Sequence, residues 1–329
     1  MFELYPGGGF YLNEAESDAH LERVVSSPMF RKVIVTQNVT RDYLLRKKFC
    51  EREEIEFIYG VVEASDALSE VPGRRVRYGA DKRCLAARGK THECVHDRGR
   101  AALQVRVSPV QSTRALAPLV VLSRHIAFFR SLLDICFVAN KYMPRGVDKG
   151  YDRFIASARI LRGRYPELRF HVVGDFTEED VEVTDLRDCI TFYGHQFTPF
   201  FPGFYSRMDI ILSPNVPFLF SPGAFDGFPT GCCIEAALCG AAMFVSDELA
   251  MNEDRLKDGE EVVVIPCEPE QIAELVEKYV ADPERLACLA QNGQRAIRNL
   301  FAVDVQTTPR LRLLSDLLAG TSADGPKGR

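Results

Sequence analysis

The sequence lacks the features that mark membrane, secreted and disulfide-stabilised proteins. No stretch approaches the roughly 18 consecutive apolar residues that a membrane-spanning helix needs, and Met1 to Phe10 has neither the basic region nor the long apolar core of a secretory signal. The ten cysteines stand at scattered spacings, which favours reduced thiols over a disulfide framework. Together these absences predict a cytoplasmic protein without a transmembrane segment.

What the sequence does contain is enough apolar material for a sizeable core. Of the 329 residues, 46% are hydrophobic and 26% are charged, and this length is typical of about two domains. The net charge of −5 is unevenly distributed: residues 73–133 hold eleven Arg and two Lys against three acidic residues, a balance of +10, so the rest of the chain carries −15.

The basic block at 73–133 is of a kind that suits nucleic acid or anionic lipid. However, its arginines form no helical stripe, and no aromatic residues are interleaved with them for base stacking. We therefore expect a solvated or poorly ordered insertion and no nucleic-acid partner.

Residues 134–301 alternate apolar strand patterns with helical patterns. The helix expected at 150–164 carries Phe154, Ile155, Ala158 and Leu161 at helical spacing. Strands are expected at 135–139, 169–173, 189–193, 209–212, 242–245 and 262–265, and further helices near 200–207, 231–239, 269–280 and 283–300. This alternation predicts an α/β fold with a doubly wound parallel sheet, Rossmann-like, which binds ligands beyond the carboxyl ends of its strands.

The N-terminal segment fits only part of a domain. A strand is expected at 32–35, a helix at 40–47 and a short strand at 57–59, and about 70 residues are too few for a complete doubly wound domain. The glycine run from Tyr5 to Phe10 is interpreted as a loop, because no strand is expected before it. The predicted division is a partial N-terminal domain at 1–72, the basic insertion at 73–133, the main domain at 134–303, and a C-terminal helix with a disordered tail at 304–329.

Three cations lie in the loop that joins the first strand of the main domain to its helix. Lys141, Arg145 and Lys149 stand where this loop meets a helix N-terminus. The free amides and the dipole of a helix N-terminus favour a phosphate group, which Lys or Arg side chains can clamp. An ordinary charged surface loop is the alternative interpretation.

A second loop, at 225–235, combines glycines with the start of a helix. Gly227 and Gly231 permit a tight backbone path close to a ligand. Residues 230–233 would present free amides at the helix start, an arrangement suited to a diphosphate.

Acidic side chains flank that helix start. Glu235, one turn into the helix, has two oxygens that can accept hydrogen bonds from a vicinal diol such as the ribose hydroxyls, and Asp226 offers the same to a sugar. A plain turn before a core helix does not explain an acid on an otherwise apolar helix. A third loop, after the strand at 189–193, could hold a base through backbone contacts at Gly194; its His195 is more typical of a surface residue than of a catalyst.

These segments resemble a known family. Residues 226–247, DGFPTGCCIEAALCGAAMFVSD, are similar to the acid-Gly-Phe…Glu-Ala-x-x-x-Gly…Ser/Thr-Asp signature of family-4-type retaining glycosyltransferases, which have the GT-B fold. The order of the remaining pieces agrees: Lys149-Gly150, Val172-Val-Gly174, Tyr193-Gly194, Asp209-Ile-Ile-Leu-Ser-Pro214 and Asp258-Gly259. The resemblance covers about 134–301, and a weaker one at 30–60 corresponds to the end of the family's acceptor domain, most of which the sequence lacks.

The resemblance implies roles for individual residues. Glu235 takes the place of the acid that grips the ribose of the donor, and Asp226 takes the place of the acid near the transferred sugar, although eight residues separate them rather than the family's seven. Lys149, with Lys141 or Arg145, takes the place of the cations that neutralise the leaving diphosphate. The other implied donor-binding residues are Gly194, Gly227, Phe228, Thr230 and Gly231. Because cations and amides carry this task, neither a metal nor a cofactor is expected.

The sequence thus predicts a retaining, metal-independent glycosyltransferase that moves a hexosyl group from a nucleotide sugar to a glycan, lipid-linked or other acceptor. One alternative is a non-catalytic nucleotide-sugar-binding remnant that needs a partner domain, and another is a sugar-nucleotide epimerase of the same fold. His92-Glu93-x-x-His96 matches a zinc-protease pattern, but helical periodicity and a third ligand are missing, so this interpretation is disfavoured.

Residues 86–133 are expected to be dispensable for the main domain. Arg77 to Leu85 would run directly into Asp134, and the segment between them has an anomalous charge and little periodicity. Deleting 86–133 should leave the melting temperature and nucleotide binding of the main domain unchanged. Loss of folding on deletion would show that the segment is structural.

Overall fold

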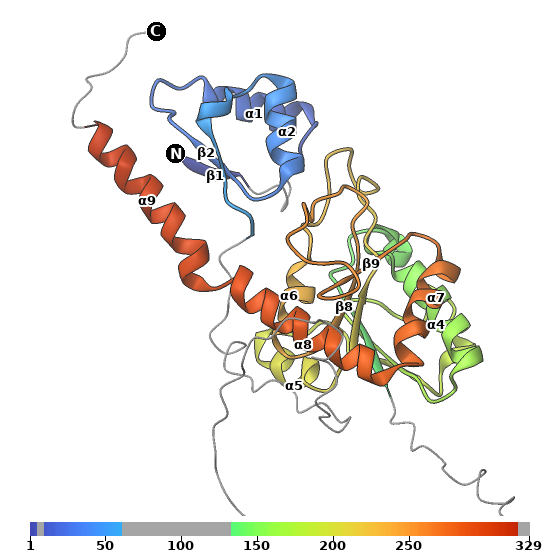
Figure 1. Ribbon diagram of the computed structural model, residues 1–329. Coiled ribbons are helices and arrows are strands. Elements are labelled where there is room, and N and C mark those ends of the chain that lie inside the picture. The colour runs from blue at the N-terminus through green and yellow to red at the C-terminus, as the bar shows by residue number, and fades with distance from the viewer. Residues whose placement is uncertain (5–9, 61–132, 322–329) are drawn as a thin grey trace, which may run out of the picture. The chain divides into compact units, whose positions relative to one another are not determined.

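The computed structural model describes residues 1–4, 10–60 and 133–321 (Figure 1). The predicted basic insertion up to residue 132, the His92–His96 pentapeptide and the predicted C-terminal tail from residue 322 lie outside the described residues. No helix within the described ranges is long and apolar enough to cross a membrane.

The main domain is built on a six-stranded sheet in the order β6-β5-β4-β7-β8-β9, in which every neighbouring pair is parallel. The strands are β4 (Asp134–Val138), β5 (Arg169–Val173), β6 (Ile190–Phe192), β7 (Ile210–Ser213), β8 (Ala242–Ser246) and β9 (Val263–Ile265). Strand order reverses between β4 and β7, which are neighbours in the sheet but not in the sequence. The doubly wound parallel sheet predicted from the sequence is confirmed, and the reversal point is where such sheets bind ligands.

Helices cover both faces of this sheet. They are α4 (Tyr151–Arg164), α5 (Phe201–Tyr205), α6 (Gly231–Leu238), α7 (Pro269–Val280) and α8 (Pro283–Leu300), with short 3-10 helices η3 (Pro144–Lys149), η4 (Thr184–Leu186) and η5 (Thr198–Phe200). The helix α9 (Val303–Thr321) follows. All five helices expected in the main domain are present, each within a few residues of its expected bounds.

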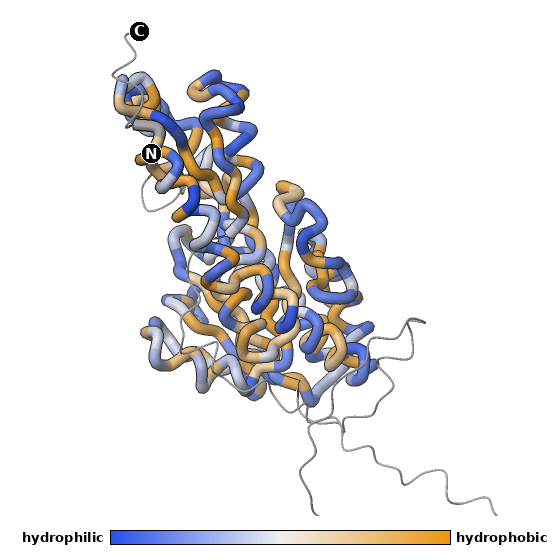
Figure 2. Tube along the Cα trace, turned by 60° about the vertical axis from the view of Figure 1, so that its left-hand side comes forward, coloured by the Kyte–Doolittle hydropathy of each residue, from blue (hydrophilic) through white to orange (hydrophobic). Residues whose placement is uncertain are grey.

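The two faces form separate cores because successive strand residues point to opposite sides. In β4, Ile135 and Phe137 join a cluster with α4 and α7, whereas Cys136 joins a second cluster with α5, α6 and the end of α8. Figure 1 shows α4 and α7 on one side of the strands and α6 on the other. The apolar, orange segments of Figure 2 run through the interior of this domain. The strands are therefore apolar on both faces, as the sequence pattern indicated.

The N-terminal residues form a small parallel sheet in the order β1-β2-β3. Its elements are β1 (Phe2–Leu4), α1 (Ala15–Val25), β2 (Val33–Val35), α2 (Asn38–Lys47), a 3-10 turn η1 (Arg52–Glu54) and β3 (Ile55–Phe57). Two expectations need correction. The strand expected at 57–59 is β3, two residues earlier, and a strand that was not predicted, β1, does precede the glycine run. β1 has only three residues, one of them Glu3, and α1 buries only Ser17 and Leu21, so neither shows a clear period.

Candidate functional site

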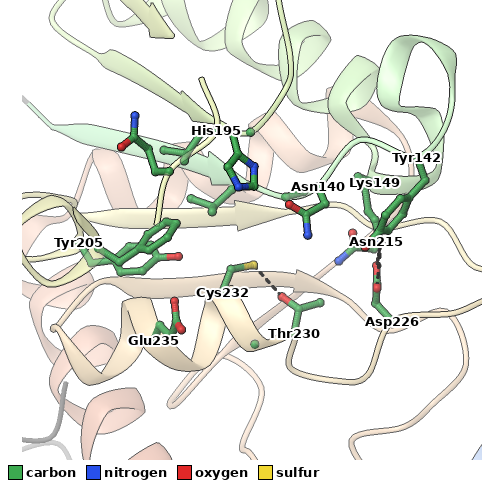
Figure 3. A pocket seen from close by; sticks show the side chains of 17 residues that line it. Asn140, Tyr142, Lys149, His195, Tyr205, Asn215, Asp226, Thr230, Cys232 and Glu235 are labelled. Atoms are coloured by element: carbon green, nitrogen blue, oxygen red, sulfur yellow. Dashed lines mark hydrogen bonds and ion pairs between the residues drawn. The ribbon is translucent and has the colours of Figure 1, made fainter. Parts of the chain in front are cut away.

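A cavity of about 390 Å³ opens at the carboxyl ends of the strands, across the reversal point between β4 and β7 (Figure 3). The ends of β4 and β5, the loops after β4, β6 and β7, and the helices α5 and α6 all contribute to its wall. The lining residues are Val138, Ala139, Asn140, Tyr142, Lys149, Val173, Gly174, His195, Gln196, Phe201, Tyr205, Asn215, Asp226, Thr230, Gly231, Cys232 and Glu235. Segments nearly a hundred residues apart in the chain thus meet at one site.

Two glycines allow the loops to approach closely enough to form this cavity. Gly150, with φ +69°, lies against the carbonyl of Pro214 so tightly that a Cβ there would be 1.9 Å from the oxygen. Gly174, with φ +127°, would place a Cβ 2.0 Å from the carbonyl oxygen of Ala139. Only glycine fits either position, because both the backbone angle and the available space exclude a side chain.

Lys149 is the cation of the cavity. Its side chain is 11% exposed, and its Nζ donates to both carboxylate oxygens of Asp226, at 2.8 Å and 2.7 Å. The same Nζ lies 4.8 Å from the centre of the Tyr142 ring. An ammonium has three N–H donors, and a two-oxygen partner leaves one of them for a ligand. The structure therefore joins the two residues that the sequence predicted as catalytic, Lys149 and Asp226, in one ion pair.

A second carboxylate, that of Asp148, belongs to the residue that directly precedes Lys149 in η3. Asp148 is 6% exposed, and its Oδ1 has no hydrogen-bond partner among the described residues. Burial raises the pKa of this carboxyl above its ordinary value, against the opposing effect of the Lys149 charge. Its backbone carbonyl accepts from Val216 N at 3.0 Å, so η3 is tied to the loop after β7, and Lys149 is held at the cavity.

The N-terminus of α6 faces the same cavity. Thr230 precedes the helix with extended backbone angles, but its hydroxyl lies 3.1 Å from Cys232 Sγ and does not cap the first turn. The first amides of a helix have no intrahelical acceptor, and the first turn of α6 carries no acidic residue. The amides of Gly231 and Cys232 therefore form a positive end that suits an anion.

Glu235 lies one turn into α6, half-buried between the buried neighbours Ile234 and Ala236. In Figure 3 its carboxylate lies beside Tyr205 at one end of the cavity, whereas Lys149 and Asp226 lie at the other end. The site is therefore elongated, with cationic and amide groups toward one end and a carboxylate acceptor at the other.

Not every residue predicted for the site lines the cavity. Lys141 donates to both carboxylate oxygens of Asp180, at 3.0 Å and 2.9 Å, outside it. Arg145 lines a separate surface depression that also contains Asp180. A break in the backbone lies between these two cations and Lys149. Arg145 and Gly146 adopt left-handed angles (φ +58° and +60°), which interrupt η3 and change the direction of the chain before Lys149.

The other predicted residues divide in the same way. Thr230, Gly231 and Glu235 line the cavity. Gly227 and Gly194 do not, and Phe228 is 1% exposed within the core. The sequence interpretation missed Asn140, Asn215, Gln196 and Tyr205 as lining residues. Asn140 and Asn215 lie just after β4 and β7, next to the reversal point, so their positions in the sequence could have identified them as lining residues.

Comparison with known proteins shows what the main domain is similar to. Residues 142–296, a little under half of the chain, match the family model Glycosyl transferases group 1, which agrees with the glycosyltransferase resemblance seen in the sequence. No curated protein matches the sequence.

Solved structures show the same fold at low sequence identity. A glycosyltransferase from Rickettsia africae ESF-5 has a TM-score of 0.59 and 13% identity, over 96% of this chain and 69% of that protein. A mutant of S. aureus TarM, in complex with fondaparinux, α-GlcNAc-glycerol and UDP, has a TM-score of 0.58 and 13% identity, over 95% of this chain and 50% of TarM. Anabaena HepE in complex with UDP has a TM-score of 0.58 and 14% identity, over 93% of this chain and 71% of HepE. The fold is that of GT-B glycosyltransferases, of which this chain spans a part.

Proposed function

We propose that this chain transfers a hexosyl group from a nucleotide-sugar donor to an acceptor in polysaccharide or glycoconjugate synthesis in the cytoplasm, with retention of anomeric configuration and without a metal. One observation carries the proposal: the buried Lys149 ammonium, fixed by Asp226 at 2.7 Å, shares a cavity with the uncapped N-terminus of α6. Two sources of positive charge thus converge where a diphosphate would lie.

The chemistry required of the site is stabilisation of a leaving group. When the bond between the anomeric carbon and the diphosphate oxygen breaks, its electron pair stays on the diphosphate. The remaining Lys149 donor and the first amides of α6 would stabilise that growing negative charge. The charge comes from groups already in place, so no metal is invoked. Asp226 orients Lys149 and keeps its outer lone pairs for the sugar hydroxyls.

The length of the cavity supports a nucleotide-linked donor. The carboxylate of Glu235 lies beyond the α6 N-terminus and away from Lys149 (Figure 3), where ribose hydroxyls would donate to it. HepE has been solved with UDP and with UDP-glucose, and the TarM complex also contains UDP. Uridine nucleotides are therefore the first ligands to test.

The direct test is a panel of nucleotide sugars scored for donor hydrolysis and for transfer. We expect release of nucleoside diphosphate that persists in EDTA, and NMR of the product should show the anomeric configuration of the donor. Binding without hydrolysis or transfer would favour a nucleotide-sugar-binding module that needs a partner domain. Inactivity after EDTA treatment that is restored by a divalent ion would contradict the metal-independent proposal.

Glu235→Ala is expected to weaken UDP binding by about 1–3 kcal/mol, because ribose hydroxyls buried in the cavity would lose their acceptor. Folding should persist, since the change removes a polar group and no core volume. Isothermal titration calorimetry with UDP measures the effect. Glu274→Ala, at an exposed position of α7, is the control and should bind like the wild type. Equal affinity in both variants would remove Glu235 from the site.

A further inference from the structure

Tyr205, at the end of α5, has a hydroxyl group with an unusual environment. The residue is completely buried, and its ring stacks on Phe201, with centroids 5.4 Å apart and planes at 25°. Its hydroxyl has no hydrogen-bond partner in the part of the chain that the structure describes. Tyr205 nevertheless lines the cavity, and Figure 3 shows the hydroxyl directed toward the space between Cys232 and Glu235.

Other buried tyrosines of the protein behave differently. The hydroxyl of Tyr43 donates to Asp18, that of Tyr59 to the carbonyl of Phe228, and that of Tyr279 to the carbonyl of Gly259 at 3.5 Å. A buried hydroxyl without a partner loses its hydration and gains nothing in return, so native proteins seldom keep one. Phenylalanine would fill the same volume at Tyr205 without that cost. A ligand that enters the cavity would supply the missing partner.

We propose that Tyr205 Oη forms a hydrogen bond with a ribose hydroxyl of the nucleotide donor, next to the contact of Glu235 with the same diol. This inference rests on the proposed function. A carboxylate only accepts hydrogen bonds, whereas a phenol both donates and accepts. The two groups together therefore match a vicinal diol, whose hydroxyls also do both.

The position of Tyr205 along the cavity favours a contact with the ribose of the nucleotide over a contact with its diphosphate. Tyr205 and Glu235 lie at the end opposite Lys149 and Asp226 (Figure 3). Burial raises the pKa of the Tyr205 hydroxyl well above its ordinary value, so the group stays neutral and keeps its proton to donate. A neutral donor serves a sugar hydroxyl, whereas the diphosphate meets the cation and the amides at the other end.

The test is Tyr205→Phe, which removes one oxygen atom, in the full chain. Without nucleotide, the variant should melt higher than the wild type by about 2–4 °C, because an unpaired buried hydroxyl has been removed. Its affinity for UDP should fall about 5- to 10-fold. UDP analogues that lack the 2′ or the 3′ hydroxyl identify the contact: the analogue without the bonded hydroxyl should bind equally to wild type and variant.

Tyr279→Phe is the matched control. It makes the same change at a buried tyrosine whose hydroxyl has protein partners and lies outside the cavity, so its melting temperature should fall and its UDP affinity should stay unchanged. The opposite signs of the two melting shifts separate a ligand contact from a structural one. A lower melting temperature for Tyr205→Phe, or unchanged UDP affinity, overturns the contact alone. Failure of the wild type to bind any nucleoside diphosphate overturns the proposed function and the contact with it.

Discussion

Replacing Lys149 by alanine is expected to lower turnover about 10²- to 10³-fold, the loss typical of removing one preorganised group that stabilises transition-state charge. Donor affinity should fall much less, because the negative charge on the diphosphate grows as the glycosidic bond breaks. Lys149→Arg should restore part of the turnover, since a planar guanidinium keeps the charge but not the geometry with Asp226. Steady-state kinetics of donor hydrolysis, with UDP affinity measured in parallel, separate the two effects.

Lys141→Ala tests whether a second lysine of the same loop contributes to turnover. Lys141 lies in the same loop, but its ammonium is engaged by Asp180 outside the cavity, so its replacement should have a much smaller effect on turnover. Lys278→Ala, at an exposed position of α7, is the neutral control. If Lys149→Ala retains full turnover while Lys141→Ala loses it, the leaving-group role belongs to Lys141 and the proposed site is misplaced.

The second large effect is on stability. Gly150→Ala is expected to lower the free energy of unfolding by about 2–5 kcal/mol, because alanine disfavours a left-handed backbone and its Cβ would lie 1.9 Å from the Pro214 carbonyl oxygen. Gly194→Ala is the matched comparison. Gly194 has nearly the same φ, +65°, but a Cβ added there would meet no atom within 4 Å, so only the backbone cost of about 1–2 kcal/mol applies.

Urea unfolding of both variants measures this difference. Equal losses would show that the contact between the loop after β4 and the end of β7 relaxes freely. A larger loss at Gly150 would show that this contact is rigid and holds Lys149, the preceding residue, in the cavity.

Much of the main domain was predictable because its strands are apolar on both faces and its helices keep a clear period. The position of Lys149, Thr230, Gly231 and Glu235 at the cavity also follows from that pattern together with the family resemblance, because they lie between a strand end and the first turn of the next helix. Lys141 and Arg145 show the limit of such reasoning. Three cations in one loop are equivalent in sequence, and what separates them is the left-handed backbone at Arg145 and Gly146.

Tyr205 shows a second limit. Its neighbours Phe200, Phe201 and Phe204 make it indistinguishable in the sequence from one more aromatic core residue. Only the structure shows that its hydroxyl is without a partner among the described residues and lies at a cavity wall. The short β1 and the polar α1 were missed for a different reason, since their assignment depends on tertiary pairing with β2 and not on a local pattern.

If the proposed transfer takes place, the ion pair of Lys149 and Asp226 has a consequence for product release. An ammonium that is only 11% exposed would be costly to leave alone when an anionic product departs. Because both oxygens of Asp226 already bind Nζ, Lys149 would remain in a neutral pair after the product has left. In the proposed reaction, Asp226 would therefore act as a counter-ion that limits how tightly the cavity retains the nucleoside diphosphate product, which would favour turnover over product inhibition.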